Sequence, residues 1–360
     1  MKVSGVNVSN IVGARDRAKY PGLPSGRPHK EYLDPRKSAL GGSGFRLAAA
    51  RNTGAPIDLR SAGDHDFGMK SQLGPTSNRF ISQRLRLNYV DWGNPDAPPL
   101  ILQHGGRDHC RSWDWVAEEL RQDWHVICPD LRGHGDSEWS PEGHYGMDAL
   151  VYDFAQLVHT LGHEKVTIIA HSLGGNVATR FTGLFPEKVE KFVNIEGLGP
   201  PPHIRRQMEE RGIGDRLKQW IEDKRRASGR MPRKYATRKD AYQRMKEENS
   251  FLTEEQARHL TIHGASRNED GTWSWKFDNY VNVWSVSDLP TSDVVALWQA
   301  ITCPVLMLWG KNSFSQSPAD DGRIDWFPTA RLVEYEDAGH WLHHDQFERF
   351  MTDVKAFLAP

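Results

Sequence analysis

The sequence predicts an α/β protein with a mostly parallel sheet, helices on both faces of that sheet, and an inserted, mainly helical cap domain. From residue 80 onward, short apolar segments typical of strands alternate with longer amphipathic segments typical of helices. Polar and glycine-rich motifs follow the apolar segments, which places these motifs at the carboxyl ends of the strands, where parallel sheets bind their ligands. The length of 360 residues suits one α/β domain with additions.

The first part of the predicted core, residues 80–198, contains most of this alternation. Strands are predicted where apolar residues alternate with polar ones or form a short run: 85–89, 100–102, 125–128, 166–171 and 189–195. Helices are predicted where apolar residues recur at helical spacing: 112–120, 147–161 and 176–185. Ser112 is the expected N-cap of the first helix because its hydroxyl can accept a hydrogen bond from the helix N-terminus.

Residues 199–295 interrupt the alternation. The segment opens with three prolines, continues as a heavily charged helical stretch that breaks at Gly264–Asn268, and then reaches Trp273–Phe277, an aromatic stretch that predicts a short strand or an extended lining segment. An insertion of this length exceeds an ordinary loop, so we expect a helical cap over the site. Its large apolar side chains fit either a cap core or a pocket wall: Trp220, Met231, Phe251, Trp273, Trp275 and Trp284.

The second part of the core, residues 296–360, restores the pattern. Its expected elements are strands at 304–310 and 330–335 and a last helix at about 341–358.

Residues 1–79 differ from the rest in composition. They are rich in Gly, Ser, Pro and Arg, and residues 1–80 hold 13 Lys and Arg against 6 Asp and Glu, a net of +7, whereas the remainder holds 33 against 41, a net of −8. We expect a poorly ordered basic arm that lies partly on the acidic body. A targeting peptide is the alternative, although Gly, Pro and scattered acids disrupt the amphipathic helix that it needs.

The composition argues against several classes of function. The net charge is −1, which does not suggest a nucleic-acid partner. No apolar run of about 18 residues occurs, so no membrane span is expected, and the N-terminus lacks the apolar core of a secretory signal. The three cysteines, Cys110, Cys128 and Cys303, show neither CxxC nor metal-ligand spacing. We therefore expect a cytoplasmic protein with reduced thiols and no metal, with contact between Cys110 and substrate as an alternative.

The most informative stretch is Val166–Gly175, which reads VTIIAHSLGG. An apolar strand ends in a turn of small residues with Ser172 at its centre, and a helix follows. Small residues flank the serine because the backbone there is strained and packs closely against its neighbours. The motif resembles the nucleophile elbow of the α/β-hydrolase superfamily, with Ala170 in place of the first glycine of G-x-S-x-G.

Three further motifs support this resemblance because they occur in the same chain order. They are the His104-Gly105-Gly106 loop, the D-x-R-G-x-G-x-S loop at 130–137, and Gly339-His340 after the last strand. We expect His104 to brace its loop and the charges of the second loop to pair with one another. From about Phe80 to the C-terminus the chain is therefore similar to a capped serine hydrolase of the AB hydrolase-1 type.

The resemblance implies specific roles for several residues. Ser172 would be the nucleophile and His340 the base that takes its proton. The turn after the penultimate strand usually carries the acid, but here it holds Ser313, which cannot carry the charge. Some family members take the acid from the end of the strand after the elbow helix, which gives Glu196. The alternative is an aspartate at 320, 321 or 325.

The resemblance also implies an oxyanion hole formed by the backbone N–H groups of Gly106 and Leu173, because two such donors stabilise the negative charge that develops on the substrate. The expected activity is acyl transfer to water from a largely apolar carboxylic ester, lactone or thioester, without a cofactor. Hydrolysis of an activated carbon–carbon bond is one alternative, and a ligand-binding, receptor-like protein that retains the triad is another. Substrate identity and oligomeric state stay open.

Overall fold

The computed structural model describes residues 74–286 and 288–360, and all of them belong to one compact unit of the chain. Most of the predicted basic arm, residues 1–73, lies outside the described residues. The first strand, β1 (Thr76–Ser82), begins before the predicted boundary at residue 80, and its antiparallel pairing with the next strand extends to Thr76 opposite Asp91.

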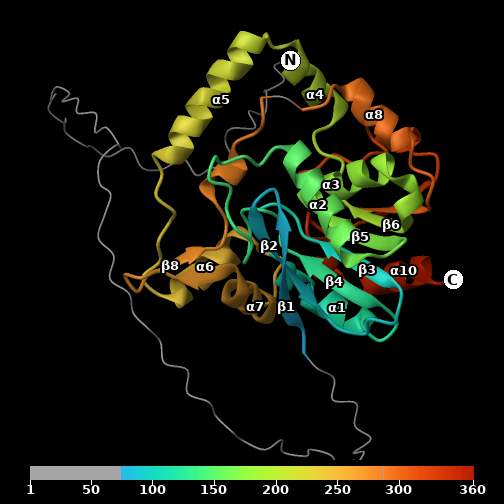
Figure 1. The fold of residues 1–360 in the computed structure, drawn as a ribbon, viewed down its shortest axis with the longest axis horizontal. Helices are drawn as coiled ribbons and strands as arrows, with labels where there is room; N and C mark the ends of the chain where they lie inside the picture. The colour runs from blue at the N-terminus through green and yellow to red at the C-terminus, as the bar shows by residue number, and fades with distance from the viewer. Residues whose placement is uncertain (1–73, 287) are drawn as a thin grey trace, which may run out of the picture. The chain divides into compact units, whose positions relative to one another are not determined.

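The described residues contain a sheet of eight strands in the order β1-β2-β4-β3-β5-β6-β9-β10 (Figure 1). The strands after β1 are β2 (Leu85–Asp91), β3 (Pro99–Gln103), β4 (His125–Pro129), β5 (Val166–His171), β6 (Val189–Ile195), β9 (Val305–Gly310) and β10 (Ala330–Tyr335). Strand β2 is antiparallel to both neighbours, and the six strands from β4 to β10 are mutually parallel. The mostly parallel sheet predicted from the sequence is confirmed.

Helices cover both faces of the sheet. The core helices are α1 (Asp114–Leu120), α2 (Met147–Leu161), α3 (Ser172–Leu184), α8 (Thr291–Gln299), α9 (Leu342–Asp345) and α10 (Phe347–Leu358). Leu100 and Leu102 pack with α1 and α10, whereas Ile101 packs with α2, α3 and α8 on the other face. All three side chains are fully buried, because alternate residues of a central strand point into opposite, helix-covered layers.

The segment between β6 and β9 carries most of the remaining elements. They are α4 (Pro202–Glu210), α5 (Ile213–Ser228), α6 (Arg238–Glu248), α7 (Glu254–Gly264) and a two-stranded sheet of β7 (Ala265–Arg267) and β8 (Trp273–Trp275). The helical stretch thus ends where Gly264–Asn268 predicts a break, and the aromatic stretch forms a strand. A bidentate ion pair between Arg180 of α3 and Asp288, with both N–O distances at 2.6 Å, ties the far end of this segment to the core.

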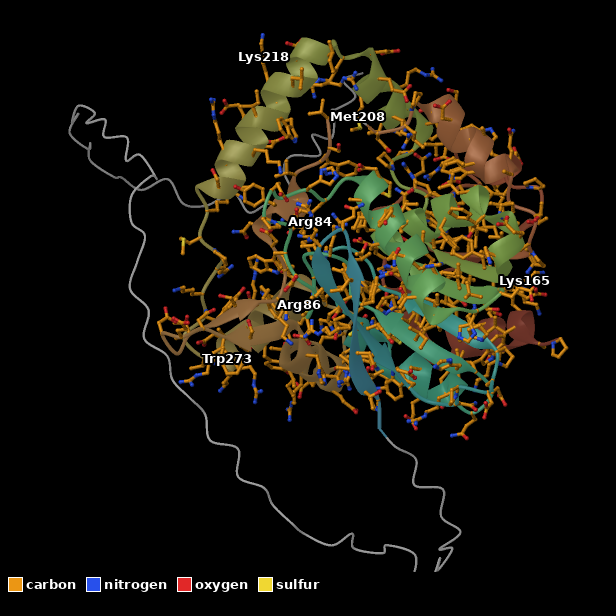
Figure 2. All side chains as sticks on the ribbon, in the orientation of Figure 1. Arg84, Arg86, Lys165, Met208, Lys218 and Trp273 are labelled. Atoms are coloured by element: carbon orange, nitrogen blue, oxygen red, sulfur yellow. The ribbon has the colours of Figure 1, made fainter. Side chains whose placement is uncertain are left out.

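The inserted segment has a small buried cluster of Leu252, Ala257 and Leu260, but the large apolar side chains singled out from the sequence lie outside it. Met231, Trp284 and Phe251 are 79%, 67% and 55% exposed, and Trp220, Trp273 and Trp275 are half-buried. Figure 2 shows Trp273 on the small sheet and Lys218 on the outer side of α5. None of these six side chains is fully buried, which fits a pocket wall better than a cap core.

Two local predictions need correction. Helix α1 begins at Asp114 after a 3₁₀ turn, and Ser112 donates its hydroxyl to the His109 carbonyl instead of capping the helix. The last helix is divided at Gln346, where φ of −131° and ψ of 58° leave the helical region. Among the helices in the described part of the chain, none combines the length and apolar sequence needed to span a membrane.

Candidate active site

Ser172 stands at the junction of β5 and α3. The strand ends at His171, the helix begins at Ser172, and Ser172 has φ of +51°, in the left-handed region that non-glycine residues rarely adopt. Gly174 follows because the turn leaves no room for a side chain: a Cβ at this position would lie 2.3 Å from the carbonyl oxygen of His104. The sharp turn therefore sets the hydroxyl at the N-terminus of α3, beyond the carboxyl end of the strand.

His340 lies in the loop between β10 and α9, with Nε2 2.9 Å from Ser172 Oγ. Its position is fixed by two neighbours. The carbonyl of His340 accepts a hydrogen bond of 2.9 Å from Nε2 of His171, and the N–H of Gly339 donates to Asp345 Oδ2 at 2.8 Å. His340 is buried, so its ring is held against Ser172 by the protein itself.

Glu196 follows the last residue of β6 and lies beside His340. Its Oε2 is 2.5 Å from His340 Nδ1 and accepts a second hydrogen bond of 2.5 Å from Ser313 Oγ. Its Oε1 accepts the N–H of Gly310 at 2.8 Å. Among the alternative acids, Asp321 binds Arg323 instead, with 2.9 Å between Oδ1 and Nε. The structure thus brings together the three side chains named from the sequence.

The charge state of this pair follows from its surroundings. Burial lowers the pKa of His340 to about 4, so the ring is neutral at pH 7. Burial raises the pKa of the Glu196 carboxyl, and the hydrogen bonds from Ser313 and Gly310 oppose that rise. The net shift of the Glu196 pKa is upward, to about 8, but three donors converge on the carboxyl group, and their hydrogen bonds favour its ionised form. A neutral imidazole with its proton on Nδ1 then leaves Nε2 free to accept the proton of Ser172.

Gly106 and Leu173 are neighbours in the fold. A Cβ on Gly106 would lie 3.6 Å from Leu173 Cδ2, and a Cβ on Gly105 would lie 3.0 Å from Ser172 Cβ. Leu173 is the second residue of α3, so its N–H has no acceptor earlier in the helix. Both residues belong to the immediate surroundings of Ser172, and their action as an oxyanion hole stays a prediction.

The loops around the site are braced by hydrogen bonds. His104 acts as expected, because its Nε2 accepts the N–H of Leu131 at 3.0 Å and its Nδ1 donates to the Gly105 carbonyl at 2.7 Å. Asp130 accepts the N–H of Cys110 at 2.7 Å, and Cys110 is buried together with the other two free cysteines.

The expectation that the charged side chains of the 130–137 loop pair with one another is wrong. Arg132 pairs instead with Asp153 of α2, with an N–O distance of 2.5 Å. The carboxylate of Asp130 binds backbone, including the N–H of Asp136 at 2.9 Å.

Two residues that hold the site were not identified from the sequence. His171 lies within the elbow motif but carries no signal that it supports His340, since the contact spans 169 residues. Ser313 stands where the usual acid is absent, and only the fold shows that its hydroxyl contacts the relocated acid.

A group of possible metal ligands lies between α1 and α7. The ligand atoms of Asp114, His259 and His263 are within 4.8 Å of one another. Arg111 already binds the Asp114 carboxylate, with Nε 2.8 Å from Oδ1 and an Nη nitrogen 2.5 Å from Oδ2, and His259 Nε2 is 3.1 Å from the same group. Because Arg111 supplies the counter-charge, we interpret the cluster as a cross-link between the core and the inserted segment.

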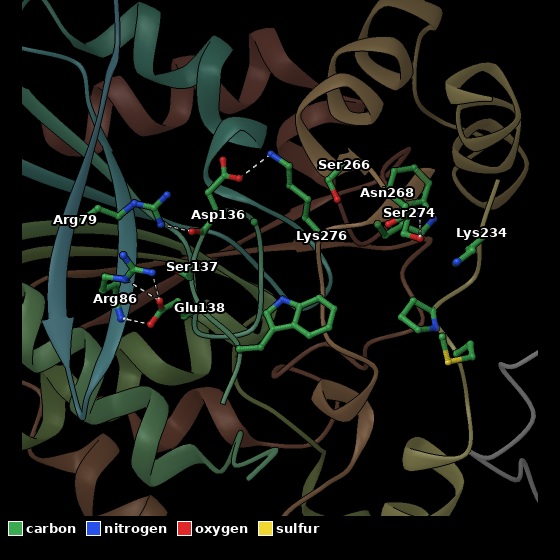
Figure 3. A pocket seen from close by; sticks show the side chains of 15 residues that line it. Arg79, Arg86, Asp136, Ser137, Glu138, Lys234, Ser266, Asn268, Ser274 and Lys276 are labelled. Atoms are coloured by element: carbon green, nitrogen blue, oxygen red, sulfur yellow. Dashed lines mark hydrogen bonds and ion pairs between the residues drawn. The ribbon is translucent and has the colours of Figure 1, made fainter. Parts of the chain in front are cut away.

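A cavity of about 610 Å³ lies between the core and the inserted segment (Figure 3). Figure 3 shows two ion pairs among its charged side chains, Arg86 with Glu138 and Lys276 with Asp136. The N–O distances are 2.6 and 2.8 Å. Met231 and Trp275 are among the lining residues, whereas Ser172, His340 and Glu196 are not among the fifteen. This cavity is therefore separate from the candidate active site.

Comparisons with known proteins agree with the fold. The family model of the alpha/beta hydrolase fold matches residues 98–347. A serine hydrolase-like protein of Danio rerio is 28% identical over 280 residues, which cover 75% of this chain and 84% of that protein. Epoxide hydrolase 4 of Homo sapiens is 25% identical over 316 residues, covering 84% of this chain and 81% of that protein.

The solved structures similar to this chain include the thioesterase domain from the curacin biosynthetic pathway. The likeness has a TM-score of 0.68 at 20% identity and covers 79% of this chain and 100% of that domain. At this identity the likeness concerns the fold. With the family model matching more than half of its length, the chain belongs to the alpha/beta hydrolase fold family.

Proposed function

We propose that this protein is a serine hydrolase that cleaves a largely apolar carboxylic ester, lactone or thioester by acyl transfer to water. The observation that carries the proposal is the continuous line of hydrogen bonds from Ser172 Oγ through His340 to Glu196, with distances of 2.9 and 2.5 Å. A serine hydroxyl is a weak nucleophile until a base takes its proton, and this arrangement supplies the base and the group that orients it.

The proposed reaction has two halves. His340 Nε2 takes the proton of Ser172 as Oγ attacks the carbonyl carbon, and the N–H groups of Gly106 and Leu173 stabilise the oxyanion. His340 then gives the proton to the leaving oxygen or sulfur, and the acyl group stays on Ser172. Water, deprotonated by His340, attacks the acyl carbon, and His340 returns this proton to Ser172 Oγ as the bond to the acyl group breaks and the acid is released. Glu196 stabilises the imidazolium that forms in each half.

The names of the relatives support hydrolysis and name two kinds of it, the cleavage of esters or thioesters and the opening of epoxides. A Danio rerio relative is called serine hydrolase-like, and similar solved structures include a thioesterase domain and an esterase of M. tuberculosis. Other relatives are called epoxide hydrolases. Capped epoxide hydrolases attack with a carboxylate, whereas the elbow of this chain presents the hydroxyl of Ser172. Acyl transfer therefore fits the side chain at the elbow better than epoxide opening.

We further propose that the chain consists of an arm (1–79), a core in two parts (80–198 and 296–360) and a cap (199–295) that bounds the substrate pocket. Two contacts support a role of the inserted segment at the site. Gln256 of α7 donates a hydrogen bond of 3.2 Å to the His344 carbonyl. The Phe251 ring lies 3.4 Å from the position that a Cβ on Gly339 would occupy. The exposed aromatic side chains of this segment favour a largely apolar small molecule as substrate.

A receptor-like protein that binds the ligand and turns it over slowly is the second candidate. The absence of an acid after Gly310 favours this candidate, whereas the contact of Glu196 with His340 favours the enzyme. Hydrolysis of an activated carbon–carbon bond is a further alternative, in which a carbon leaving group would take the proton in place of oxygen or sulfur. Slow turnover combined with strong stabilisation by the ligand would distinguish the receptor from an enzyme.

The test is covalent labelling with a fluorophosphonate, followed by mass spectrometry to locate the adduct. We expect rapid labelling of Ser172, loss of labelling in Ser172→Ala and His340→Ala, and slower labelling in Glu196→Gln. His144→Ala is a matched control because this histidine is exposed and its nearest charged partner is Asp148, four residues along the chain. A wild-type protein that does not label would contradict the proposed reaction, and equal labelling of Glu196→Gln would contradict the role of Glu196.

A further inference from the structure

Phe314 places an exposed aromatic ring directly beside the candidate base. Its ring centre is 4.5 Å from that of His340, with 42° between the ring planes. The side chain belongs to the loop after β9 and is 75% exposed. A single exposed apolar residue is ordinary on a protein surface, so the position of this ring, rather than its exposure, makes it informative.

The ring contacts of His340 are of two kinds. His171 and Trp341 contact it at 4.7 and 5.1 Å, and these side chains are buried and half-buried. They belong to the packed surroundings that hold the imidazole. Phe314 is the one of these three partners whose ring is exposed, so a bound molecule can cover it.

The chain on both sides of Phe314 is held in place. Ser313 donates its hydroxyl to Glu196 at 2.5 Å and accepts the N–H of Ser315 at 3.0 Å. The carbonyl of Ser315 accepts a hydrogen bond of 2.9 Å from Trp309 Nε1. The ring is therefore presented by a fixed turn that is connected to the site, which is the arrangement expected of a preorganised contact.

The chemistry of the proposed reaction decides which part of a substrate meets this ring. The oxyanion points toward Gly106 and Leu173, and the leaving oxygen or sulfur must approach His340 Nε2 to receive its proton. The substituent on the leaving atom consequently extends from the side of His340. An aromatic or other bulky apolar substituent there would cover Phe314 and would remove its apolar surface from water.

We propose that Phe314 forms a subsite for the leaving group, and that the substrate is an ester or thioester whose alcohol or thiol part carries an aromatic or bulky apolar substituent. The inference rests on the proposed serine hydrolase function and names the substrate class of that site. Phe251 of the inserted segment, which is 55% exposed and lies 3.4 Å from the Cβ position of Gly339, is a second exposed aromatic side chain beside the loop that carries His340.

Two isomeric esters test the subsite. Benzyl acetate carries its aromatic ring on the alcohol, and methyl phenylacetate carries the same ring on the acyl group, so the two differ in position and not in composition. We expect the wild type to favour benzyl acetate in kcat/KM. Phe314→Ala should lower kcat/KM for benzyl acetate by about 10- to 100-fold, as for other apolar pocket contacts, and leave methyl phenylacetate within about twofold.

Two control variants separate the subsite from general effects. Phe314→Leu retains an apolar side chain and should keep part of the preference. Phe185→Ala removes another partly exposed phenylalanine at the far end of α3, roughly 20 Å from Ser172 at 1.5 Å per residue, and should change neither ester.

A second readout does not depend on turnover. Benzyl alcohol should slow fluorophosphonate labelling of Ser172 in the wild type and not in Phe314→Ala. If Ser172 labels in both proteins but neither the ester preference nor the protection depends on Phe314, the subsite is absent while the serine hydrolase stands. If Ser172 does not label in the wild type, the proposed function fails and the subsite fails with it.

Discussion

Ser313 donates a hydrogen bond of 2.5 Å from its hydroxyl to Oε2 of Glu196, the same oxygen that lies 2.5 Å from His340 Nδ1. The serine occupies the turn after β9, the position from which most members of this superfamily supply the acid. Here that turn contributes a hydrogen-bond donor, and the carboxylate comes from the end of β6. The side chains at positions 313 and 196 therefore meet beside His340. An experiment can thus ask whether a carboxylate at either position serves as the acid.

The first prediction concerns the hydrogen bond from Ser313 to Glu196 and the charge on Glu196. Ser313→Ala removes a hydrogen bond to an ionised group, worth about 1.5–3 kcal/mol, and should slow fluorophosphonate labelling of Ser172 by about 10- to 100-fold. Glu196→Gln should cost on the order of 1000-fold or more, because an amide cannot stabilise the imidazolium.

An aspartate at position 313 has the reach to meet His340 Nδ1. The double variant Glu196→Gln/Ser313→Asp should therefore recover at least about tenfold over Glu196→Gln alone, consistent with a restored charge of opposite sign. The labelling rates of Ser313→Ala, Glu196→Gln and the double variant test whether position 313 can supply the acid. Absence of any recovery would mean that the turn after β9 cannot position an acid.

The second prediction is the pH dependence of the same labelling reaction. Because burial lowers the pKa of His340 to about 4, the free base persists well below neutrality. The rate should decline only as the pH approaches about 4, where the ring gains a proton on Nε2 and can no longer take one from Ser172.

Trp341→Ala provides the comparison, because its ring lies 5.1 Å from His340 and its removal admits water. The midpoint should then move up toward the ordinary histidine value of about 6.5. Tryptophan fluorescence checks that both proteins stay folded across the range. A wild-type midpoint near that ordinary value would contradict the burial argument and would indicate that the Glu196 carboxylate, 2.5 Å from Nδ1, offsets the effect of burial on the ring.

The third prediction concerns the link between the inserted segment and the core. Arg180 is 3% exposed and binds Asp288, which is 39% exposed, through two hydrogen bonds of 2.6 Å. Asp288→Asn leaves a buried guanidinium without its counter-charge and should lower the free energy of unfolding by about 2–4 kcal/mol, measured by urea denaturation.

Glu190→Gln is the matched control, because Glu190 pairs with Lys165 and both side chains are more than half exposed. Its effect should stay below about 1 kcal/mol. Equal effects of the two substitutions would show that the Arg180 pair is no more than a surface contact.

The fourth prediction concerns the turn at Ser172. A Cβ on Gly174 would lie 2.3 Å from the His104 carbonyl oxygen, which is backbone and cannot move aside cheaply. Gly174→Ala should therefore lower the free energy of unfolding by about 1–3 kcal/mol or more and reduce labelling of Ser172. Gly214→Ala in α5, where nothing lies within 4 Å of the new Cβ, should be neutral or stabilising by up to about 1 kcal/mol. A Gly174→Ala protein as stable and reactive as the wild type would contradict the tight packing of the elbow.

The sequence was most informative where the pattern is local. The strand 330–335 and the helix 147–161 were predicted with the bounds that the structure shows, because their apolar periodicity is continuous and their ends carry clear signals. Ser112 was misplaced as an N-cap because a short 3₁₀ turn, which has no sequence signature of its own, precedes the helix. The last helix was expected to be continuous, and its division at Gln346 has no breaker residue in the sequence.

The sequence by itself determined the α/β fold, the chain order of the main-sheet strands from β2 onward, and the identity of Ser172, His340 and Glu196 as candidates, because each is marked by residues close by in the chain. Only the tertiary structure decided that Glu196, rather than an aspartate at 320–325, contacts His340, and that Ser313, His171 and Phe314 surround the pair. These contacts join residues 117 to 169 positions apart, or depend on which face of a loop meets a ring. Such residues meet because the parallel strands that carry them lie side by side in the sheet. A local sequence pattern does not show which distant residues will be neighbours.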